Sequence, residues 1–188
     1  MGKAGPMDRD PEQVLDEYLV VMARAGSAVA FGRLAIRWTP RLRRHAVRLL
    51  ARPEGADDAV QDAWLAIARG LKRLEDPARF PAWALAITSR RCIDLIRRRQ
   101  RDRRLTGELT ADVSATAPAT PFADHGLDLT ATIARLPTDQ RLMVSLFYGE
   151  DLSVEAIAQA HNLSTGTVKS RLHAARQTLK RCLEGETP

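Results

Sequence analysis

Residues 152–180 read LSVEAIAQAHNLSTGTVKSRLHAARQTLK. Ser153 and Ser164 are suitable N-caps for two short helices, because a serine hydroxyl accepts a hydrogen bond from the first helical turn. Asn162 lies between them, where a tight turn needs a left-handed backbone that asparagine tolerates better than most residues. The pattern therefore predicts a helix over 154–160, a turn, and a second helix from about Ser164.

The second of these helices has two unlike faces. An apolar stripe of Val168, Leu172, Ala175 and Leu179 recurs at helical spacing and predicts packing on the first helix. The remaining surface carries hydrogen-bond donors, which is typical of a helix-turn-helix whose second helix enters the major groove. A solvated amphipathic hairpin would carry similar residues. The candidate DNA contacts are Ser164, Thr165, Thr167, Lys169, Ser170, Arg171, His173 and Arg176.

A second basic segment, residues 90–104, reads RRCIDLIRRRQRDRR and holds eight arginines against two aspartates. The guanidinium group binds phosphate oxygens in a bidentate way, so this segment favours a polyanionic partner. A solvated helix end is also often basic, but it needs fewer charges. Phe80 and Trp83 precede the segment and could stack on unpaired bases, although such aromatic residues more often belong to a core.

Apolar stripes at spacings of three and four predict helices over 31–49, 60–71 and 81–99. Pro40 falls inside the first stripe and should break or kink it into two pieces. Asp57 and Asp58 favour the start of the second helix, because their charges complement a helix N-terminus.

Helices are also expected after residue 128. The first covers 129–136, and Pro137 begins the next, which Gly149 ends. No run of alternating residues predicts a strand, so the chain is expected to be all-α.

Residues 105–128 read LTGELTADVSATAPATPFADHGLD, with four acids, no Lys or Arg and almost no bulky apolar side chain. Such a segment cannot bury enough surface to offset its ordering entropy, which predicts a flexible acidic linker. The alternative, a long surface loop inside one domain, is uncommon. The sequence therefore predicts two small helical domains, 14–104 and 129–183.

Composition excludes several classes of protein. The 188 residues suit one large or two small domains, and no apolar run approaches the ~18 residues of a membrane span. Residues 1–13 are charged and unlike a signal peptide, so a cytoplasmic protein without membrane insertion is expected. Cys92 and Cys182 are far apart, which excludes a disulfide scaffold and a CxxC zinc site. The pI near 10 indicates a polyanionic partner.

Two helical domains joined by an acidic linker resemble the extracytoplasmic-function (group IV) sigma factors of bacterial RNA polymerase. Residues 57–71, DDAVQDAWLAIARGL, are similar to the polymerase-binding helix of that family. Residues 80–99, FPAWALAITSRRCIDLIRRR, are similar to its −10-element helix. Residues 136–179, LPTDQRLMVSLFYGEDLSVEAIAQAHNLSTGTVKSRLHAARQTL, are similar to its −35-binding domain.

The resemblance implies a dissociable subunit that directs core RNA polymerase to promoters, with a region 2-like bundle and a region 4-like helix-turn-helix domain. It implies core polymerase and promoter DNA as partners, an anti-sigma factor as a further partner, and no cofactor. Arg90 stands where the family usually has Asn, and Ala174 where Arg is frequent. The implied polymerase-binding residues are Asp57, Asp58, Gln61 and Asp62. The implied −10 contacts are Phe80, Arg90, Arg91, Asp94, Arg97 and Arg98.

Other functions fit less well. The carboxylates of Asp57, Asp58, Asp62 and Asp94 could suggest a metal or catalytic cluster, but no histidine follows at ligand spacing and no glycine-rich phosphate loop occurs. No enzyme activity, metal or catalytic residue is therefore expected. A stand-alone helix-turn-helix regulator is the alternative. A DNA-processing enzyme such as a recombinase is a third, against which the lack of a nucleophile counts.

Overall fold

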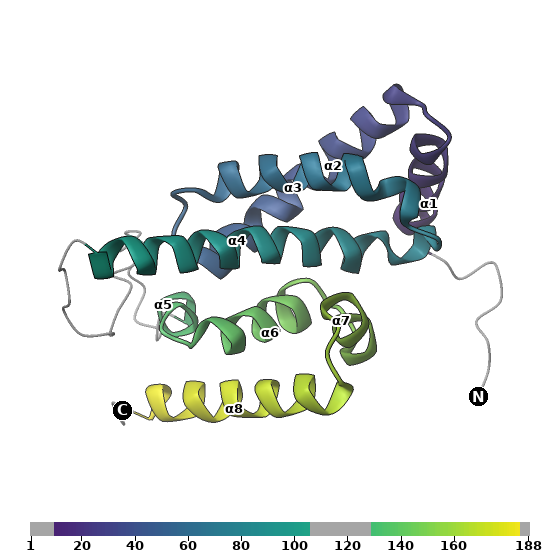
Figure 1. Ribbon diagram of the computed structural model, residues 1–188. Coiled ribbons are helices and arrows are strands. Elements are labelled where there is room, and N and C mark those ends of the chain that lie inside the picture. Colours follow the sequence, from purple (N-terminus) through teal and green to yellow (C-terminus); the bar gives the residue numbers. More distant parts are fainter. Residues whose placement is uncertain (1–9, 106–128, 185–188) are drawn as a thin grey trace, which may run out of the picture.

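The computed structural model describes residues 10–105 and 129–184, and this part of the chain is helical without strands (Figure 1). The predicted all-α class is confirmed. Apart from Leu105, which ends a helix, the predicted linker lies outside the described residues. The helices are α1 (Pro11–Arg24), α2 (Ala28–Leu50), α3 (Ala56–Gly70), α4 (Phe80–Leu105), α5 (Leu129–Ala134), α6 (Thr138–Gly149), α7 (Val154–His161) and α8 (Thr165–Leu183), with 3-10 turns η1 (Leu71–Arg73) and η2 (Pro77–Arg79) before α4.

Helix α1 is an element that the sequence analysis did not predict. The carboxylate of Asp10 caps it by accepting a hydrogen bond from the backbone N–H of Glu12 at 3.0 Å. Pro11 follows in the first turn, where its missing N–H removes no helical hydrogen bond. An Asp-Pro pair before an apolar segment is a recognisable start signal, so this helix was within reach of sequence reasoning.

Helix α2 runs without a break through Pro40, so of the predicted break or kink the break does not occur. Pro40 lies on the exposed side of the helix, whereas Trp38 and Leu42 on either side of it are buried. Proline in a helix interior costs about 3 kcal/mol. Burial of the apolar stripe of α2 offsets this cost, because each buried Leu side chain contributes roughly 1.5–3 kcal/mol.

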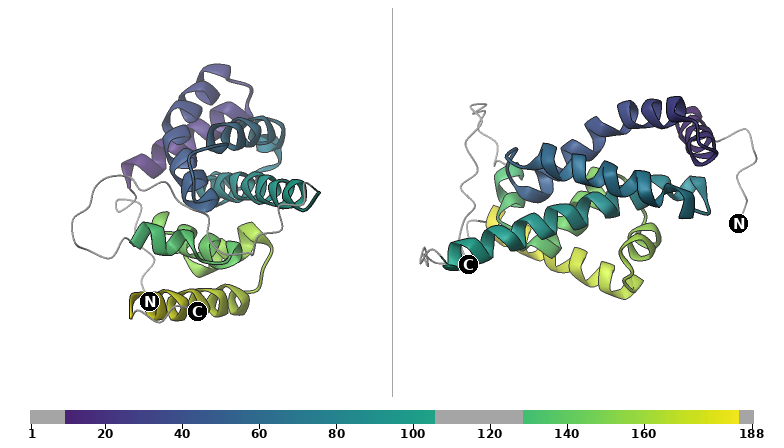
Figure 2. Two further views of the ribbon diagram at one scale, coloured as in Figure 1. Left: turned by 90° about the vertical axis from the view of Figure 1, so that its left-hand side faces the viewer. Right: turned by 45° about the horizontal axis from the view of Figure 1, so that its top comes forward.

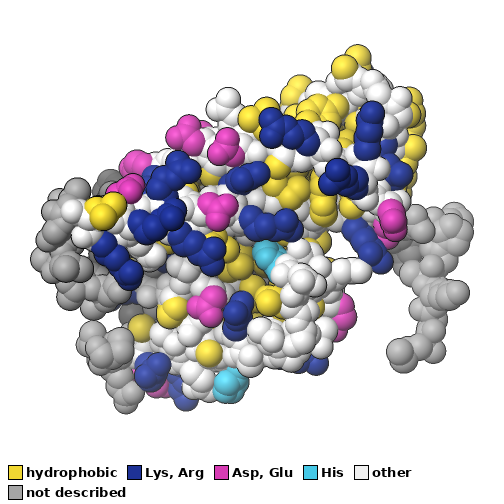
Figure 3. Space-filling model, viewed as in Figure 1, with side chains coloured by type: hydrophobic (Ala, Val, Ile, Leu, Met, Phe, Trp, Pro, Cys, Tyr) yellow, Lys and Arg dark blue, Asp and Glu magenta, His cyan; other side chains and the backbone are white. Residues whose placement is uncertain are grey.

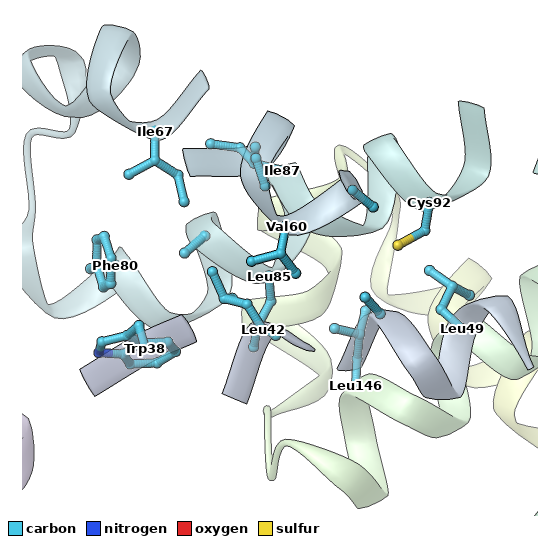
Figure 4. Packing of buried hydrophobic residues seen from close by; sticks show 14 of the residues in the cluster. Trp38, Leu42, Leu49, Val60, Ile67, Phe80, Leu85, Ile87, Cys92 and Leu146 are labelled. Atoms are coloured by element: carbon cyan, nitrogen blue, oxygen red, sulfur yellow. The ribbon is translucent and has the colours of Figure 1, made fainter. Parts of the chain in front are cut away.

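Helices α2, α3 and α4 pack around the first part of the core (Figure 4). Leu42, Ile67 and Leu85, one from each helix, are completely buried. Trp38 meets Phe80 edge to face, with ring centroids 5.3 Å apart. This packing fixes α4, which carries the arginine-rich segment, against the rest of the first domain.

The second domain consists of α5 to α8. In Figure 1 and in the left view of Figure 2, α6 lies between α4 and α8, so α8 forms the outer layer. Leu136, Val144 and Ala175 make a small buried cluster that attaches α6 to α8.

The two domains are not separate in space. Met143 and Leu146 of α6 and Ile157 of α7 are completely buried in the same apolar cluster as Leu42 and Leu49 of α2. Figure 4 shows Leu146 among the buried side chains of α2. The two predicted bundles therefore exist, but they share one core, which the sequence analysis did not anticipate.

Candidate nucleic-acid interface

The turn between α7 and α8 has the geometry that the sequence predicts. Ser164 Oγ accepts a hydrogen bond from the backbone N–H of Thr167 at 3.0 Å and so caps α8. Ser153 caps α7 in the same way, through the N–H of Ala156 at 3.1 Å. Asn162 ends α7 in the left-handed conformation, with φ 55° and ψ 47°. These three residues fix the angle at which α8 leaves α7.

Helix α8 presents most of the predicted −35 contacts to solvent. Val168, Leu172 and Ala175 are buried and form its inner face. Thr167 is half-buried and lies 2.9 Å, Oγ1 to Oγ, from Ser164. The exposed candidates are Ser164, Thr165, Lys169, Ser170, His173 and Arg176. A surface of this kind supplies donors for phosphates and base edges.

Arg171 differs from the other candidates because it is half-buried and paired. Its Nε lies 3.6 Å from a carboxylate oxygen of Asp139, at the start of α6. This ion pair joins α8 to the start of α6.

Helix α4 presents a basic face next to α3. Figure 3 shows a band of Lys and Arg side chains along this helix. Asp94 lies among them and is also exposed. The exposed arginines from the predicted −10 set are Arg90, Arg91, Arg97 and Arg98.

Phe80 is not on this face. It is 0% exposed and packs between Trp38 and Trp83, with ring centroids 5.3 and 6.2 Å away. Its predicted contact with DNA does not fit this position, because the ring already fills the core. Trp83 is half-buried and packs against the core cluster.

An open hollow of about 370 Å³ lies between α3 and α4 beside the basic face. Gly70 forms part of its wall, where an added Cβ would lie 3.0 Å from the Trp83 ring. The close approach of α3 to Trp83 therefore depends on glycine at this position. The hollow is lined by Ala66, Gly70, Arg73, Trp83, Ile87, Arg90, Arg91 and Asp94.

The predicted polymerase-binding residues form an exposed acidic surface on the first half of α3. Asp57, Asp58, Gln61 and Asp62 are all exposed. Asp57 also accepts a hydrogen bond from Arg43 Nε at 2.7 Å, and this bond raises the pKa of Arg43. The other three side chains remain available to a partner protein.

Polar side chains at the domain contact were missed by sequence reasoning. His45 of α2 is 0% exposed; its Nε2 lies 2.8 Å from Ser89 Oγ of α4, and its Nδ1 lies 3.0 Å from Ser145 Oγ of α6. Arg141 of α6, also buried, donates from Nε to the Leu49 carbonyl of α2 at 2.9 Å.

A second polar contact lies just beyond the end of α6. Glu150, which is 4% exposed, accepts hydrogen bonds from the guanidinium groups of Arg41 and Arg48 on α2. Each of these contacts joins residues about a hundred positions apart, so no local pattern could have revealed them.

Across 10–105 and 129–184, no three His, Cys, Asp or Glu side chains come together as a metal site. Among the helices of these ranges, none combines the length and apolar character that crossing a membrane requires.

Both halves of the chain match models of known protein families. The Sigma-70 region 2 model matches residues 34–102, and the Sigma-70 region 4 model matches residues 126–179. The chain is 32% identical to the ECF RNA polymerase sigma factor SigM of Mycobacterium tuberculosis over 184 residues, covering 97% of this chain and 89% of that protein.

Two solved structures have a similar fold. One is the sigma factor RpoE in complex with the anti-sigma factor NepR from Bartonella quintana. It has a TM-score of 0.68 and 25% identity, over 84% of this chain and 98% of that one. The other is CnrH in complex with the cytosolic domain of CnrY, with a TM-score of 0.66 and 27% identity, over 92% and 99%.

Proposed function

This chain belongs to the extracytoplasmic-function sigma factors, which direct bacterial core RNA polymerase to specific promoters, and we propose how its surfaces divide that task. The proposal depends on one observation: an exposed arginine face on α4 and an exposed donor face on α8 occur on two different domains of one chain. Two such faces suit two separate promoter elements.

The α4 face is the −10 surface of this proposal. Arg90, Arg91, Arg97 and Arg98 supply positive charge for the DNA backbone, and the hollow beside Trp83 supplies an aromatic wall. Asp94 is a hydrogen-bond acceptor on the same face, and a carboxylate can accept from the exocyclic amine of cytosine. Phe80 has no direct role because it is buried.

The α8 face is the −35 surface. The capped N-terminus at Ser164 brings backbone N–H groups and a helix dipole toward phosphate, which is the usual arrangement at a helix N-terminus. Lys169, Ser170 and His173 follow on the exposed side and supply donors for the major groove.

The acidic α3 surface is the polymerase-binding surface of the proposal. Asp58, Gln61 and Asp62 are exposed on the first half of α3. A partner with complementary basic residues would gain both attraction and a fixed orientation. Action in the cytoplasm follows from this role, because core polymerase and promoter DNA are found there.

An anti-sigma factor is a further partner that we propose for this chain. The similar RpoE of Bartonella quintana was solved in complex with one. Sigma factors regulate transcription without catalysing a reaction, and we assign no catalytic step to this chain.

The test of this proposal compares the purified chain with and without core RNA polymerase. Run-off transcription from a genomic promoter library should give discrete start sites only when both are present. A mobility-shift assay on one of these promoters should show a stable complex with the holoenzyme and none with the chain alone. A stand-alone regulator would give the opposite result, because it would bind the duplex without core enzyme.

A further inference from the structure

The proton positions at His45 follow from its hydrogen bonds. Ser89 Oγ donates to the Leu85 carbonyl at 2.8 Å, so it can only accept from the histidine, and the ring proton lies on Nε2. Nδ1 of His45 is then an acceptor, and the Ser145 hydroxyl donates to it. The neutral imidazole of His45 therefore has both ring nitrogens hydrogen-bonded, and it links α2, α4 and α6.

A second proton on His45 would lie on Nδ1, and it would require the Ser145 hydroxyl to turn its own proton away and accept instead. Ser145 Oγ already accepts from Arg48 Nε at 3.3 Å while its own proton points toward His45. A proton on Nδ1 would therefore face a donor. Burial, followed by the charges of Arg48, His161 and Arg41, lowers the pKa of His45 to about 3.

The charged groups around His45 come from the surrounding elements. Arg41 and Arg48 lie on α2, and Glu150 lies at the end of α6. Glu150 would favour a charged histidine, but its carboxylate is shared by the two arginines, so these three groups together carry a positive charge. His161 approaches from α7, and Arg90 from α4 lies beside it.

His161 is a second imidazole at the same contact, and it is half-buried. Its Nε2 is buried and has no hydrogen-bond partner among the described residues. Arg90 of the first domain donates to the carbonyl of the adjacent Ala160 at 3.5 Å. Burial, with the charges of Arg90 and Arg171, lowers the pKa of His161 to about 4.

We propose that this contact is a proton-sensitive interface, which holds the two domains together while His45 and His161 are neutral and releases them when both imidazoles are protonated. The inference concerns the free chain, so it does not depend on which promoters the protein recognises. Acidification would then increase the fraction of chains whose domains are separated.

The sign and size of the effect follow from linkage. In separated domains both side chains contact water and titrate near the ordinary pKa of about 6.5. The closed form is therefore fully favoured above that pH and loses stability as the pH falls below it. Between pH 7.5 and 5.5 the ratio of open to closed chains should rise about tenfold for each histidine, or about a hundredfold for both.

The experiment measures domain separation by fluorescence energy transfer between dyes on Val29→Cys and Gln177→Cys. Both positions are exposed, one on α2 and the other on α8. Cys182→Ser removes the native cysteine outside the core, and Cys92 stays unlabelled because burial raises its pKa to about 12. An Arg41→Ala background removes one partner of Glu150 and brings the open form into the measurable range.

In this background we expect the transfer efficiency to fall between pH 7.5 and 5.5, while circular dichroism shows unchanged helix content. His45→Gln and His161→Gln should each reduce the change in the open-to-closed ratio to about tenfold, and the double variant should abolish it. The matched control, His173→Gln on the exposed face of α8, should retain the full hundredfold change.

Two results would overturn the proposal. One is an open-to-closed ratio in the Arg41→Ala parent that does not change with pH, although high salt still separates the domains. The other is a His45→Gln, His161→Gln double variant with the pH dependence of its parent. Should His45→Gln fail to fold, the His161→Gln single variant decides, because the proposal requires its change in ratio to be about tenfold smaller than that of the parent.

Discussion

At the scale of the residue, Arg171 has two candidate roles, a structural ion pair and a contact with −35 DNA. Its guanidinium is half-buried against Asp139, yet it lies at the edge of the exposed face of α8. An exposed ion pair contributes about 0–1 kcal/mol, whereas a good contact to a base edge contributes about 1–3 kcal/mol. Contact of Arg171 with DNA stays a prediction, and these magnitudes make it distinguishable from a purely structural role.

Arg171→Ala should therefore weaken binding of the holoenzyme to the promoter by about 1–3 kcal/mol and relax the sequence preference at one −35 position. A contact to phosphate alone would instead lower affinity evenly and reduce the salt dependence by about one charge. Binding assays on a set of −35 variants at several salt concentrations distinguish the two. The control is Asp139→Asn, which removes the ion pair and keeps the charge of Arg171. If Asp139→Asn lowers Tm and DNA binding as much as Arg171→Ala does, Arg171 is structural.

At the scale of the element, the ends of the helices show which local signals decide the fold. Ala51 ends α2 in the left-handed conformation, with φ 57°, whereas Ala25 ends α1 with φ −72°. A left-handed conformation costs a residue with a Cβ about 1–2 kcal/mol, and glycine avoids that cost. The two alanines therefore make a matched pair.

Ala51→Gly should stabilise the chain, by roughly 0.5–1 kcal/mol after the added entropy of the unfolded chain is subtracted. Ala25→Gly should be destabilising, because its backbone gains nothing from glycine. Thermal unfolding of both variants at the same pH measures the difference. Equal changes in Tm would contradict the assigned geometry at the end of α2.

Helix α3 supports a prediction about partner binding. Gln61→Ala combined with Asp62→Lys should weaken binding to core polymerase, because it removes two exposed polar groups and reverses one charge. Helix content should stay unchanged, since neither side chain is buried. Arg69→Ala, at the other end of the same helix, is the matched control and should bind normally. Unaltered co-purification of the double variant with core enzyme would remove α3 from the polymerase-binding surface.

Local signals explain what could be predicted from the sequence at this scale. Ser153 and Ser164 cap helices, and Asn162 ends one, through contacts and backbone geometry within four residues of each position. The α7–α8 turn was therefore predicted correctly. Pro40 does not break α2, because the distant packing of α2 outweighs a local penalty. Phe80 was placed on the wrong surface because a pattern of aromatic residues does not distinguish a core ring from an exposed one.

At the scale of the whole molecule, the domain contact limits what the chain can reach. Elements centred roughly 25 base pairs apart are separated by about 85 Å along B-DNA. Helix α4, the longest described helix, has 26 residues and spans only about 39 Å. Figure 1 shows α4 and α8 on opposite sides of the single helix α6. With α4 and α8 as the proposed −10 and −35 surfaces, the two domains would have to separate before both promoter elements could be contacted at once.

Glu150→Gln should make that separation easier, because it leaves Arg41 and Arg48 without their shared carboxylate. Both arginines are about one-third exposed, so screening reduces the effect to roughly 1–2 kcal/mol. Small-angle scattering of the free protein should show a larger radius of gyration. Glu155→Gln, an exposed change on α7, serves as the control and should leave the radius unchanged. A compact Glu150→Gln variant would mean that the apolar contact alone holds the domains together.

The distance in sequence between Arg41 and Glu150 has a consequence for synthesis of the protein. The two residues are 109 positions apart, so α2 leaves the ribosome well before its partner is translated. At roughly 5–20 residues per second, that interval lasts on the order of ten seconds. During it the nascent first domain has to stay soluble with its contact face uncovered. Arg41, His45 and Arg48 place groups that water solvates well on that face, which makes the waiting chain less prone to aggregate than a purely apolar face would be.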